Sequence, residues 1–309
     1  MKLHKLNLNK DFKTKNICLC IGNFDGIHKG HQVVIKKIIK HSKELKMKSA
    51  IMTFNPHPKK FFKKIDEQFN IITSDFKKLY LNSFGIENYI EYSFNKSLSN
   101  LGSVEFIEKV LVNQLNVKKI IVGNDFKFGK DRSGDTKLLK KLSTKYNFRL
   151  ITISHIKNKL TNLKYSSSSI RENINKGNFE KVSEALGRKW HITGKVIKGN
   201  QKARLINFPT ANIRPGNHIT PKKGVYCVNA IIKGERYRGI ANFGERPTVH
   251  GTNLLLEVHI FEFNKNIYGK ELTVEFLTFI RLEKKYKNFK VLTNQIKKDV
   301  IKAKKYHKI

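Results

Sequence analysis

Apolar residues in the first half of the chain follow two patterns that alternate along the sequence. Short apolar runs indicate strands, whereas apolar residues three or four positions apart indicate helices. Strands are expected at 17–21, 49–54, 88–92, 119–122 and 148–153, and helices at 31–45, 75–81, 103–115, 136–146, 170–176 and 179–186. Strands separated by helices predict an α/β domain built on a parallel sheet.

The second half has a different pattern, in which short runs of β type dominate. These runs are expected at 190–196, 224–232, 237–243, 254–263 and 271–279, and turn signals separate them. Regularly spaced short strands predict a sandwich or a small barrel. Residues 288–306 have helical spacing and predict a terminal helix. The change of pattern places a domain boundary between Leu186 and Gly187, giving domains 1–186 and 187–309.

Composition limits the cellular setting that we expect. The length of 309 residues fits two domains. No apolar run is long enough to span a bilayer, and no secretory signal is visible. The three cysteines, Cys18, Cys20 and Cys227, give no disulfide framework. We therefore expect a cytoplasmic protein with no membrane partner, whose oligomeric state the sequence leaves open.

The formal net charge of +38 raises the alternative of a nucleic-acid-binding protein. The lysines, however, are spread along the whole chain, and no nucleic-acid motif accompanies them. A general enrichment of lysine at the surface explains the charge better. We therefore expect no specific nucleic-acid partner, although a basic surface would attract anionic substrates such as ATP.

Residues 22–31 (GNFDGIHKGH) lie where a predicted strand turns into a predicted helix. The N–H groups at the start of a helix lack partners and favour anions, and glycine lets the backbone approach a ligand closely. This stretch therefore predicts a phosphate site. His28, His57 and Asp125 each follow a predicted strand, so they should meet at the carboxyl edge of the parallel sheet, where ligands bind in such folds.

Two histidines separated by Lys29 and Gly30 fit nucleotidyl transfer. In this reaction a phosphate attacks the α-phosphorus of ATP and pyrophosphate leaves. The transition state spreads negative charge over non-bridging oxygens, so hydrogen-bond donors and cations matter more than a covalent nucleophile. The serine run at 166–169 entering a helix supplies hydroxyls, and Arg171 in its first turn opposes the helix dipole unless it binds an anion.

These stretches resemble motifs of the bacterial bifunctional riboflavin kinase/FMN adenylyltransferase (FAD synthetase) family. Residues 22–31 resemble its signature, 53–58 (TFNPHP) its T-F-x-P-H-P, 122–134 its flavin-side loop, and 166–171 (SSSSIR) its I-S-S-T-x-I-R. The resemblance implies a Rossmann-like nucleotidyltransferase domain followed by a riboflavin kinase-like β-barrel.

The resemblance also implies roles for individual residues in the first domain. His28 and His31 would stabilise the adenylyl transition state. The nucleotide site would be lined by Asn23, Asp25 and His57, together with Ser167, Ser168 and Arg171 on the ATP phosphates. Asp125 and Phe126 would border FMN. A hydroxyl and a guanidinium at a helix start suit phosphate, in agreement with this assignment.

The second half resembles riboflavin kinases in three places. Residues 208–212 (FPTAN) resemble P-T-A-N, 239–248 (GIANFGERPT) resemble G-x-x-N-I-G-x-R-P-T, and 256–261 (LEVHIF) resemble the L-E-x-H strand. Thr210 and Asn212 carry hard oxygen ligands for Mg²⁺ bound to ATP. Arg204 would also contact this nucleotide, and Glu257 would be the general base for the riboflavin 5′-hydroxyl.

The expected function is therefore phosphorylation of riboflavin to FMN and adenylylation of FMN to FAD, both with ATP and Mg²⁺. One departure leaves an alternative open, because Ala203 and Asn207 replace glycines of the kinase phosphate loop. An adenylyltransferase with a decayed kinase half would explain it. Two further alternatives are a basic nucleic-acid-binding protein and a flavin-binding regulator without turnover.

Overall fold

The computed structural model describes residues 1–65, 68–158, 161–198, 208–248 and 251–309, without the side chains of 246–248 and 251–253. The chain forms two compact units. Unit 1 comprises Met1–Glu67 and Thr73–Ser166, and unit 2 comprises Gln68–Ile72 and Ser167–Ile309. The chain therefore enters unit 2 briefly before it completes unit 1.

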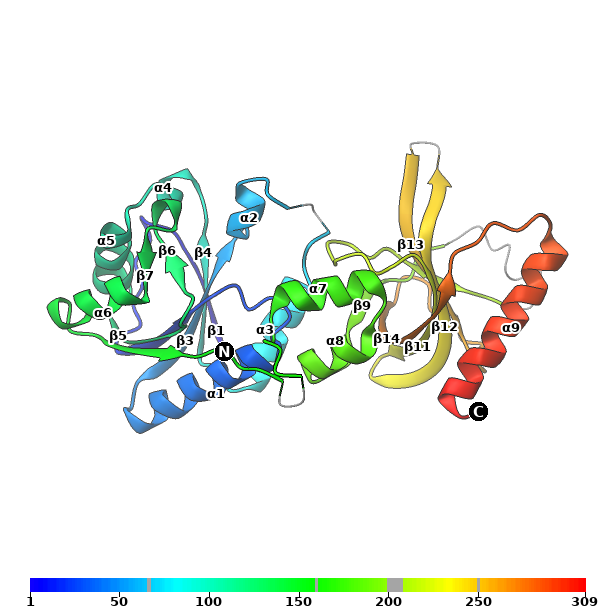
Figure 1. The fold of residues 1–309 in the computed structure, drawn as a ribbon, viewed down its shortest axis with the longest axis horizontal. Helices are drawn as coiled ribbons and strands as arrows, with labels where there is room; N and C mark the ends of the chain where they lie inside the picture. Colours follow the sequence, from blue (N-terminus) through cyan, green and yellow to red (C-terminus); the bar gives the residue numbers. More distant parts are fainter. Residues whose placement is uncertain (66–67, 159–160, 199–207, 249–250) are drawn as a thin grey trace. The chain divides into compact units, whose positions relative to one another are not determined.

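Unit 1 is built on a parallel sheet of six strands, which confirms the predicted α/β class (Figure 1). The strand order is β1-β4-β3-β2-β5-β8, and every neighbouring pair is parallel. The strands are β1 (Lys2–Leu6), β2 (Ile17–Ile21), β3 (Lys48–Asn55), β4 (Asn88–Ser93), β5 (Val117–Gly123) and β8 (Arg149–Ile153). The central strands β3, β2 and β5 carry the predicted site loops at their carboxyl ends.

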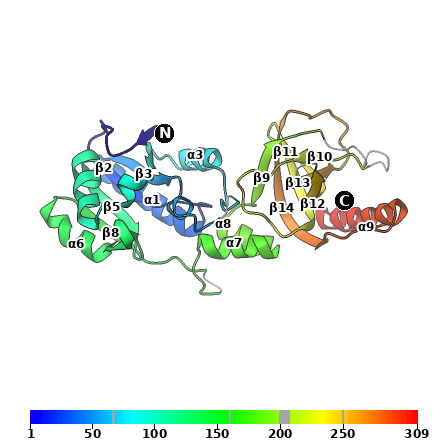
Figure 2. The same ribbon diagram turned by 90° about the horizontal axis from the view of Figure 1, so that it is seen from above.

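Helices cover both faces of this sheet. Alternate residues of β2, from Ile17 to Ile21, share an apolar cluster with η1 (Phe106–Gln114) and α6 (Thr136–Lys145), and α6 lies beside β8 (Figure 2). Cys18 and Cys20 point to the opposite face, where α1 contacts β2. The remaining elements are α1 (Lys29–Glu44), α2 (Pro58–Phe61), α3 (Ser74–Ser83), α4 (Lys96–Ser99), α5 (Ser103–Glu105), β6 (Lys127–Phe128), η2 (Lys130–Arg132) and β7 (Gly134–Asp135).

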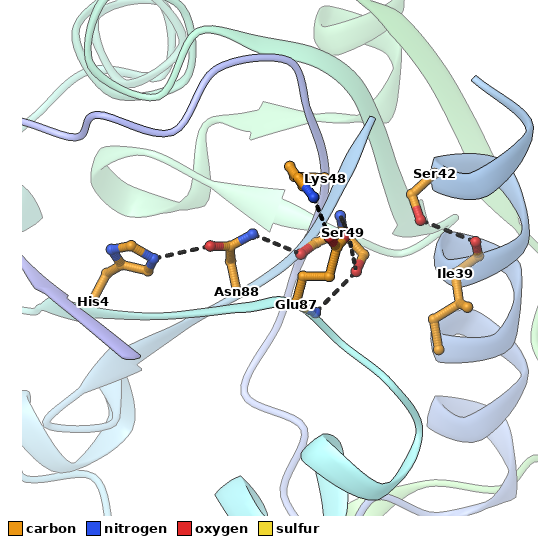
Figure 3. Close-up of polar contacts among 7 residues, drawn as sticks. All are labelled: His4, Ile39, Ser42, Lys48, Ser49, Glu87 and Asn88. Carbon is orange, nitrogen blue, oxygen red and sulfur yellow. Dashed lines mark hydrogen bonds and ion pairs between the residues drawn. The ribbon is translucent and has the colours of Figure 1, made fainter. Parts of the chain in front are cut away.

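A network of polar contacts fixes the starts of β3 and β4 at the amino edge of the sheet (Figure 3). The Glu87 carboxylate accepts hydrogen bonds from Lys48 Nζ at 2.7 Å and from the Ser49 backbone N–H at 3.0 Å. Burial acts to raise the pKa of Glu87, but these donors outweigh it and lower the net pKa. The carboxylate therefore stabilises the strand register at the edge opposite the predicted site.

Unit 2 is a six-stranded antiparallel sheet that closes on itself, which confirms the expected barrel. The order is β10-β13-β12-β11-β14-β9, and a backbone bridge between Ile197 and Asn212 joins the two ends. The strands are β9 (His191–Lys195), β10 (Ala211–Ile213), β11 (Gly224–Ile232), β12 (Glu235–Thr248), β13 (Gly251–Ile260) and β14 (Glu271–Leu282). The terminal helix α9 (Phe289–His307) packs Ala303 against β11 and β12.

Helices α7 (Ser167–Lys176) and α8 (Phe179–Leu186) belong to the same contact unit as the barrel. Phe179 of α8 stacks on Trp190 and Phe276, with ring centroids 5.6 Å and 5.1 Å away. The helix expected at 170–176 begins earlier, at Ser167, so the serine run forms its first turn. The functional division between 1–186 and 187–309 remains a prediction, because a unit of contacts need not be a unit of function.

The segment Gln68–Ile72 is held in unit 2 by named contacts. The indole Nε1 of Trp190 donates to the Ile71 carbonyl at 2.8 Å, and the Ile219 N–H donates to the Asn70 carbonyl at 2.8 Å. Arg171 Nε donates to the Phe69 carbonyl at 3.0 Å. These bonds satisfy backbone carbonyls that burial would otherwise leave unpaired.

A buried ion pair attaches α9 to the barrel. Nε and Nη2 of Arg281 on β14 donate to the Asp299 carboxylate, the shortest contact being 2.7 Å. The Asp299 side chain is only 2% exposed, and Gln295 donates a further hydrogen bond to it. Removing Asp299 would leave the guanidinium of Arg281, whose side chain is only 17% exposed, without its carboxylate partner.

We expect Asp299→Ala to lower the free energy of unfolding of unit 2 by about 3–5 kcal/mol. Trp190 is the only tryptophan and is buried in this unit, so its fluorescence during denaturant unfolding measures the change. Glu172→Ala is the matched control, because the Glu172–Lys176 pair is exposed and should matter by less than about 0.5 kcal/mol. Equal midpoints for the two variants would contradict the prediction.

Candidate active sites

The turn from β2 to α1 brings the two predicted catalytic histidines together. His28 is the N-cap of α1, and its Nδ1 accepts the His31 backbone N–H at 3.3 Å. The two imidazole rings stack with centroids 3.7 Å apart and planes 19° apart. The helix begins at Lys29 rather than at the expected residue 31, so a histidine occupies a position where Ser, Thr, Asp or Asn is usual.

The middle of this turn is buried and adopts unusual backbone angles. Asp25 is 5% exposed and His28 is 6% exposed. Phe24 and Ile27 have φ values of 48° and 42°, in the left-handed region that side chains with a Cβ rarely enter. Such residues persist only where the surrounding structure holds them, and they concentrate at functional sites.

The surroundings of His31 favour its neutral form. Burial is the main cause that lowers the pKa of His31 well below its ordinary value, and the charges of His28 and Lys77 act in the same direction. Lys77 Nζ donates to the Asn23 carbonyl at 2.8 Å. Lys77 was not predicted from the sequence, because it lies on α3, more than fifty positions along the chain.

Two buried polar atoms of the turn lack a hydrogen-bond partner among the described residues. They are Asn23 Oδ1 and His31 Nδ1. An unpaired buried polar atom is costly, so native proteins retain one mainly where a ligand or water completes it. This observation fits the predicted nucleotide site and involves two of its expected residues.

His57 follows the next strand of the sheet, as predicted. Its Nδ1 accepts the Lys59 N–H at 3.1 Å and caps the short helix α2. Around α2 lies a cluster of aromatic rings with edge-to-face contacts at centroid distances of 5.2–5.8 Å. Its members are Phe54, Phe61, Phe62 and Phe94. This cluster was not predicted from the sequence, although the pair of phenylalanines after the TFNPHP stretch was a visible signal.

Asp125 and Phe126 follow β5, the neighbour of β2 on its other side. The Asp125 side chain is 61% exposed and forms an ion pair with Lys164 Nζ at 2.9 Å. Partial burial acts to raise the pKa of Asp125, but Lys164 and His155 outweigh it and lower the net pKa. Phe126 stacks on Phe128 at a centroid distance of 5.5 Å.

Ser167, Ser168 and Arg171 lie in the first turns of α7, which belongs to unit 2. The guanidinium of Arg171 lies 3.6 Å from the centroid of the Phe69 ring, and its Nε donates to the Phe69 carbonyl. Through these contacts the Arg171 cation has partners that are not anions. The dipole argument for an anion at Arg171 therefore loses its force, and the nucleotide role of this residue stays a prediction.

The barrel aligns three polar side chains across neighbouring strands. Asn212 on β10 pairs with Glu257 on β13, which in turn pairs with Asn242 on β12. Directly paired residues of antiparallel strands lie on one face about 5 Å apart. Leu256 and Val258 are fully buried on the other face, as the predicted alternation requires.

Further contacts hold both ends of this row. Asn242 Nδ2 donates to Glu283 at 3.3 Å, and a Cβ at Gly244 would clash with the same carboxylate, so glycine permits the close approach. At the other end, His259 Nδ1 donates to the Pro209 carbonyl at 2.9 Å and anchors the segment that carries Thr210. Burial is the main cause that lowers the pKa of His259. Neither His259 nor Glu283 had a role predicted from the sequence.

The predicted Mg²⁺ ligands carry donor atoms suited to a hard cation. Asn212 is 6% exposed, and its Oδ1 is buried with no hydrogen-bond partner in the described part of the chain. An uncompensated amide oxygen two residues after the Thr210 hydroxyl is the type of ligand that suits a hard cation carrying phosphate and water ligands as well. Arg204, Ala203 and Asn207 lie outside the described residues.

Two further findings concern metals and membranes. The described residues contain no group of three or more His, Cys, Asp or Glu side chains arranged to hold a metal ion. Within the same residues, no helix has the length and apolar character needed to cross a bilayer.

Comparison with known proteins gives matches over nearly the whole chain. A family model described as FAD synthetase matches residues 10–169, and one described as riboflavin kinase matches residues 186–307. The bifunctional riboflavin kinase/FMN adenylyltransferase of Haemophilus influenzae is 38% identical over 93% of each chain. The enzyme of the same description from Escherichia coli K12 is 32% identical over 93% of this chain and 92% of its own.

A solved structure described as a macrolide-efflux protein from Streptococcus pneumoniae has the same fold. Its TM-score is 0.84 at 28% identity, with 96% of this chain and 97% of that chain covered. The two family models together support an enzyme with both domains over a single-activity adenylyltransferase or a nucleic-acid-binding protein. The chain therefore belongs to the bifunctional riboflavin kinase/FMN adenylyltransferase family, with a FAD synthetase domain followed by a riboflavin kinase domain.

Proposed function

We propose that the turn between β2 and α1 is the centre of FMN adenylylation in this chain. The observation that carries the proposal is the stacked pair His28 and His31 at the start of a helix, with the His28 side chain buried. Negative charge develops on the α-phosphate oxygens when the FMN phosphate attacks the α-phosphorus of ATP. Imidazole N–H groups and helix N–H groups that are already held in place stabilise this charge.

The bond changes of this step need no covalent enzyme intermediate. An oxygen of the FMN phosphate forms a bond to the α-phosphorus of ATP, and the bond from that phosphorus to the bridging oxygen breaks. Pyrophosphate leaves with the bonding electrons. The enzyme therefore contributes positioning and charge stabilisation, which suits a site with buried donors and no activated nucleophile.

The remaining predicted residues of unit 1 fit around this centre. We assign Asn23, Asp25 and His57 to the nucleotide side, and Asp125 and Phe126 to the flavin side. The phenylalanine cluster around α2 offers a surface on which the apolar isoalloxazine ring could stack. The ATP-phosphate roles of Ser167, Ser168 and Arg171 are proposed from the motif alone, and single alanine variants would test them.

For the kinase half, we propose that Glu257 is the general base. Its position between Asn212 and Asn242 in the row across the barrel supports this role. The riboflavin 5′-oxygen forms a bond to the γ-phosphorus, its proton passes to Glu257, and ADP leaves. Thr210 and Asn212 would hold Mg²⁺ on the ATP phosphates, where the ion supplies charge neutralisation. Arg204 is assigned to the same nucleotide.

The proposal also assigns each of the two activities to one part of the chain and assigns the protein to a cellular compartment. Residues 1–186 would carry adenylylation, and residues 187–309 would carry phosphorylation. All three cysteines are free and buried, and burial raises the pKa of Cys18 to about 11 and that of Cys227 to about 12. Unreactive thiols of this kind suit a reducing cytoplasm.

We expect the double variant His28→Asn/His31→Asn to lose FMN adenylylation by at least about 100-fold, because it removes donors aimed at the developing charge. Phosphorylation of riboflavin should stay within twofold of the wild type. Chromatographic separation of riboflavin, FMN and FAD measures both activities in one reaction. His41→Asn, near the other end of α1, is the control. Substantial FAD formation by the double variant would refute the site.

We expect Glu257→Gln to lower riboflavin phosphorylation by about 100-fold to 10,000-fold, the usual contribution of a general base. Adenylylation should be unchanged when FMN is supplied. Glu271→Gln, an exposed residue on β14, is the matched control. A normal kinase rate in the Glu257→Gln variant would remove the base assignment. A wild-type protein that makes no FMN would instead support the alternative of a decayed kinase half.

A further inference from the structure

Helix α3 places Lys77 in contact with the turn of the proposed adenylylation site. The helix begins after Thr73, whose hydroxyl caps it by accepting the Phe76 N–H at 3.2 Å. Lys77 is in the following turn, and its Nζ reaches the Asn23 carbonyl at 2.8 Å. Among the described residues, this carbonyl is the one hydrogen-bond acceptor of the ammonium. The helix thus contacts the proposed phosphate-binding turn through this charged hydrogen bond, and the Asp25 carboxylate of the same turn also attracts the ammonium.

The surroundings of Lys77 differ from those of an ordinary surface lysine. Burial is the main cause that lowers its pKa, while the carboxylates of Asp25 and Glu91 act to raise it and Lys78 acts to lower it. Lys78, the next residue, forms ion pairs with Asp75 at 3.6 Å and Glu91 at 3.9 Å. The two neighbouring lysines therefore have different partners, since Lys78 pairs with carboxylates whereas Lys77 donates to the turn.

The turn needs such an external contact. Phe24 and Ile27 both have positive φ values, a conformation that costs each of them free energy unless other groups enforce it. Asn23 precedes this strained stretch, and its side-chain Oδ1 is one of the two buried atoms of the turn without a partner among the described residues. A hydrogen bond to the Asn23 carbonyl fixes the peptide that leads into the turn.

We propose that Lys77 is a positioning residue for FMN adenylylation, whose ammonium holds the Asn23 carbonyl and adds a positive charge to the turn that carries the histidine pair. The proposal rests on the function proposed above for His28 and His31. Lys77 acts through the turn rather than on the reacting atoms. Because the contact exists before any nucleotide binds, it prepares the site for charge that develops later.

The charge of Lys77 also affects the protonation of His31. Among the described residues, His28, Lys77 and the Phe24 ring act on or contact His31, and the charges of Asp25, Glu91 and Lys78 act on the Lys77 ammonium. Removing the positive charge should raise the pKa of His31, because one of the three causes that lower it disappears. His31 would then take up a proton at a higher pH than in the wild type.

The test compares Lys77→Met, which removes the ammonium, with Lys78→Met, which leaves the contact to Asn23 intact. We expect Lys77→Met to lower kcat for FMN adenylylation at least about tenfold, because the variant lacks a charge-assisted hydrogen bond. The KM for ATP should change less than about threefold. Riboflavin phosphorylation by the same full-length enzyme should be unchanged. NMR titration of the His31 ring should show a raised pKa in Lys77→Met alone.

Lys77→Gln provides a second variant, in case the methionine disturbs folding. It retains an uncharged donor, and we expect its kcat to be at least about tenfold lower as well. Normal kcat in either Lys77 variant, or a change in KM alone, would overturn the positioning role. An unchanged His31 titration would overturn the electrostatic part. If the double histidine variant keeps its activity, the proposed site itself is wrong, and the Lys77 result identifies a different defect.

Discussion

The structure of unit 1 depends on how one turn satisfies its buried polar groups. Between β2 and α1 the chain buries Asp25 and His28, places Phe24 and Ile27 at positive φ, and leaves Asn23 Oδ1 and His31 Nδ1 buried without a hydrogen-bond partner among the described residues. Each of these features costs free energy on its own. Packing of apolar residues such as Ile27, which is fully buried, and the hydrogen bond from Lys77 hold the turn in place.

The parallel sheet brings this turn to the same edge as the other predicted site loops. The strands β3, β2 and β5 are neighbours and run in the same direction, so the loops that follow them share one edge. His57, the histidine pair and Asp125 occupy these three loops. The polar contacts of Glu87 secure the opposite edge, where they fix β3 against the start of β4. One edge of the sheet thus carries the stabilising contacts of Glu87, and the opposite edge carries the loops of the proposed site.

In the barrel, strand register rather than a loop brings the polar side chains of the proposed kinase site together. Pairing of β10, β13 and β12 sets Asn212, Glu257 and Asn242 side by side, and contacts from Glu283 and His259 support the two ends of the row. A slip of one residue would turn Glu257 toward the fully buried positions of Leu256 and Val258. Burial of one face therefore specifies the side chains that reach the other.

Local patterns in the sequence determined much of this protein. The strand at Ile17–Ile21, the helix at Phe179–Leu186 and the strand at Gly224–Ile232 begin and end where periodicity predicts, because short-range spacing and turn residues set such bounds. The motifs also identified the family. The short strands β1 and β10 escaped prediction, since each depends on pairing with a distant strand. Tertiary structure alone decided the contact of Lys77 with Asn23, the phenylalanine cluster around α2 and the attachment of Gln68–Ile72 to unit 2. Each of these joins residues that are far apart in the chain, and neither periodicity nor local spacing carries information about such contacts.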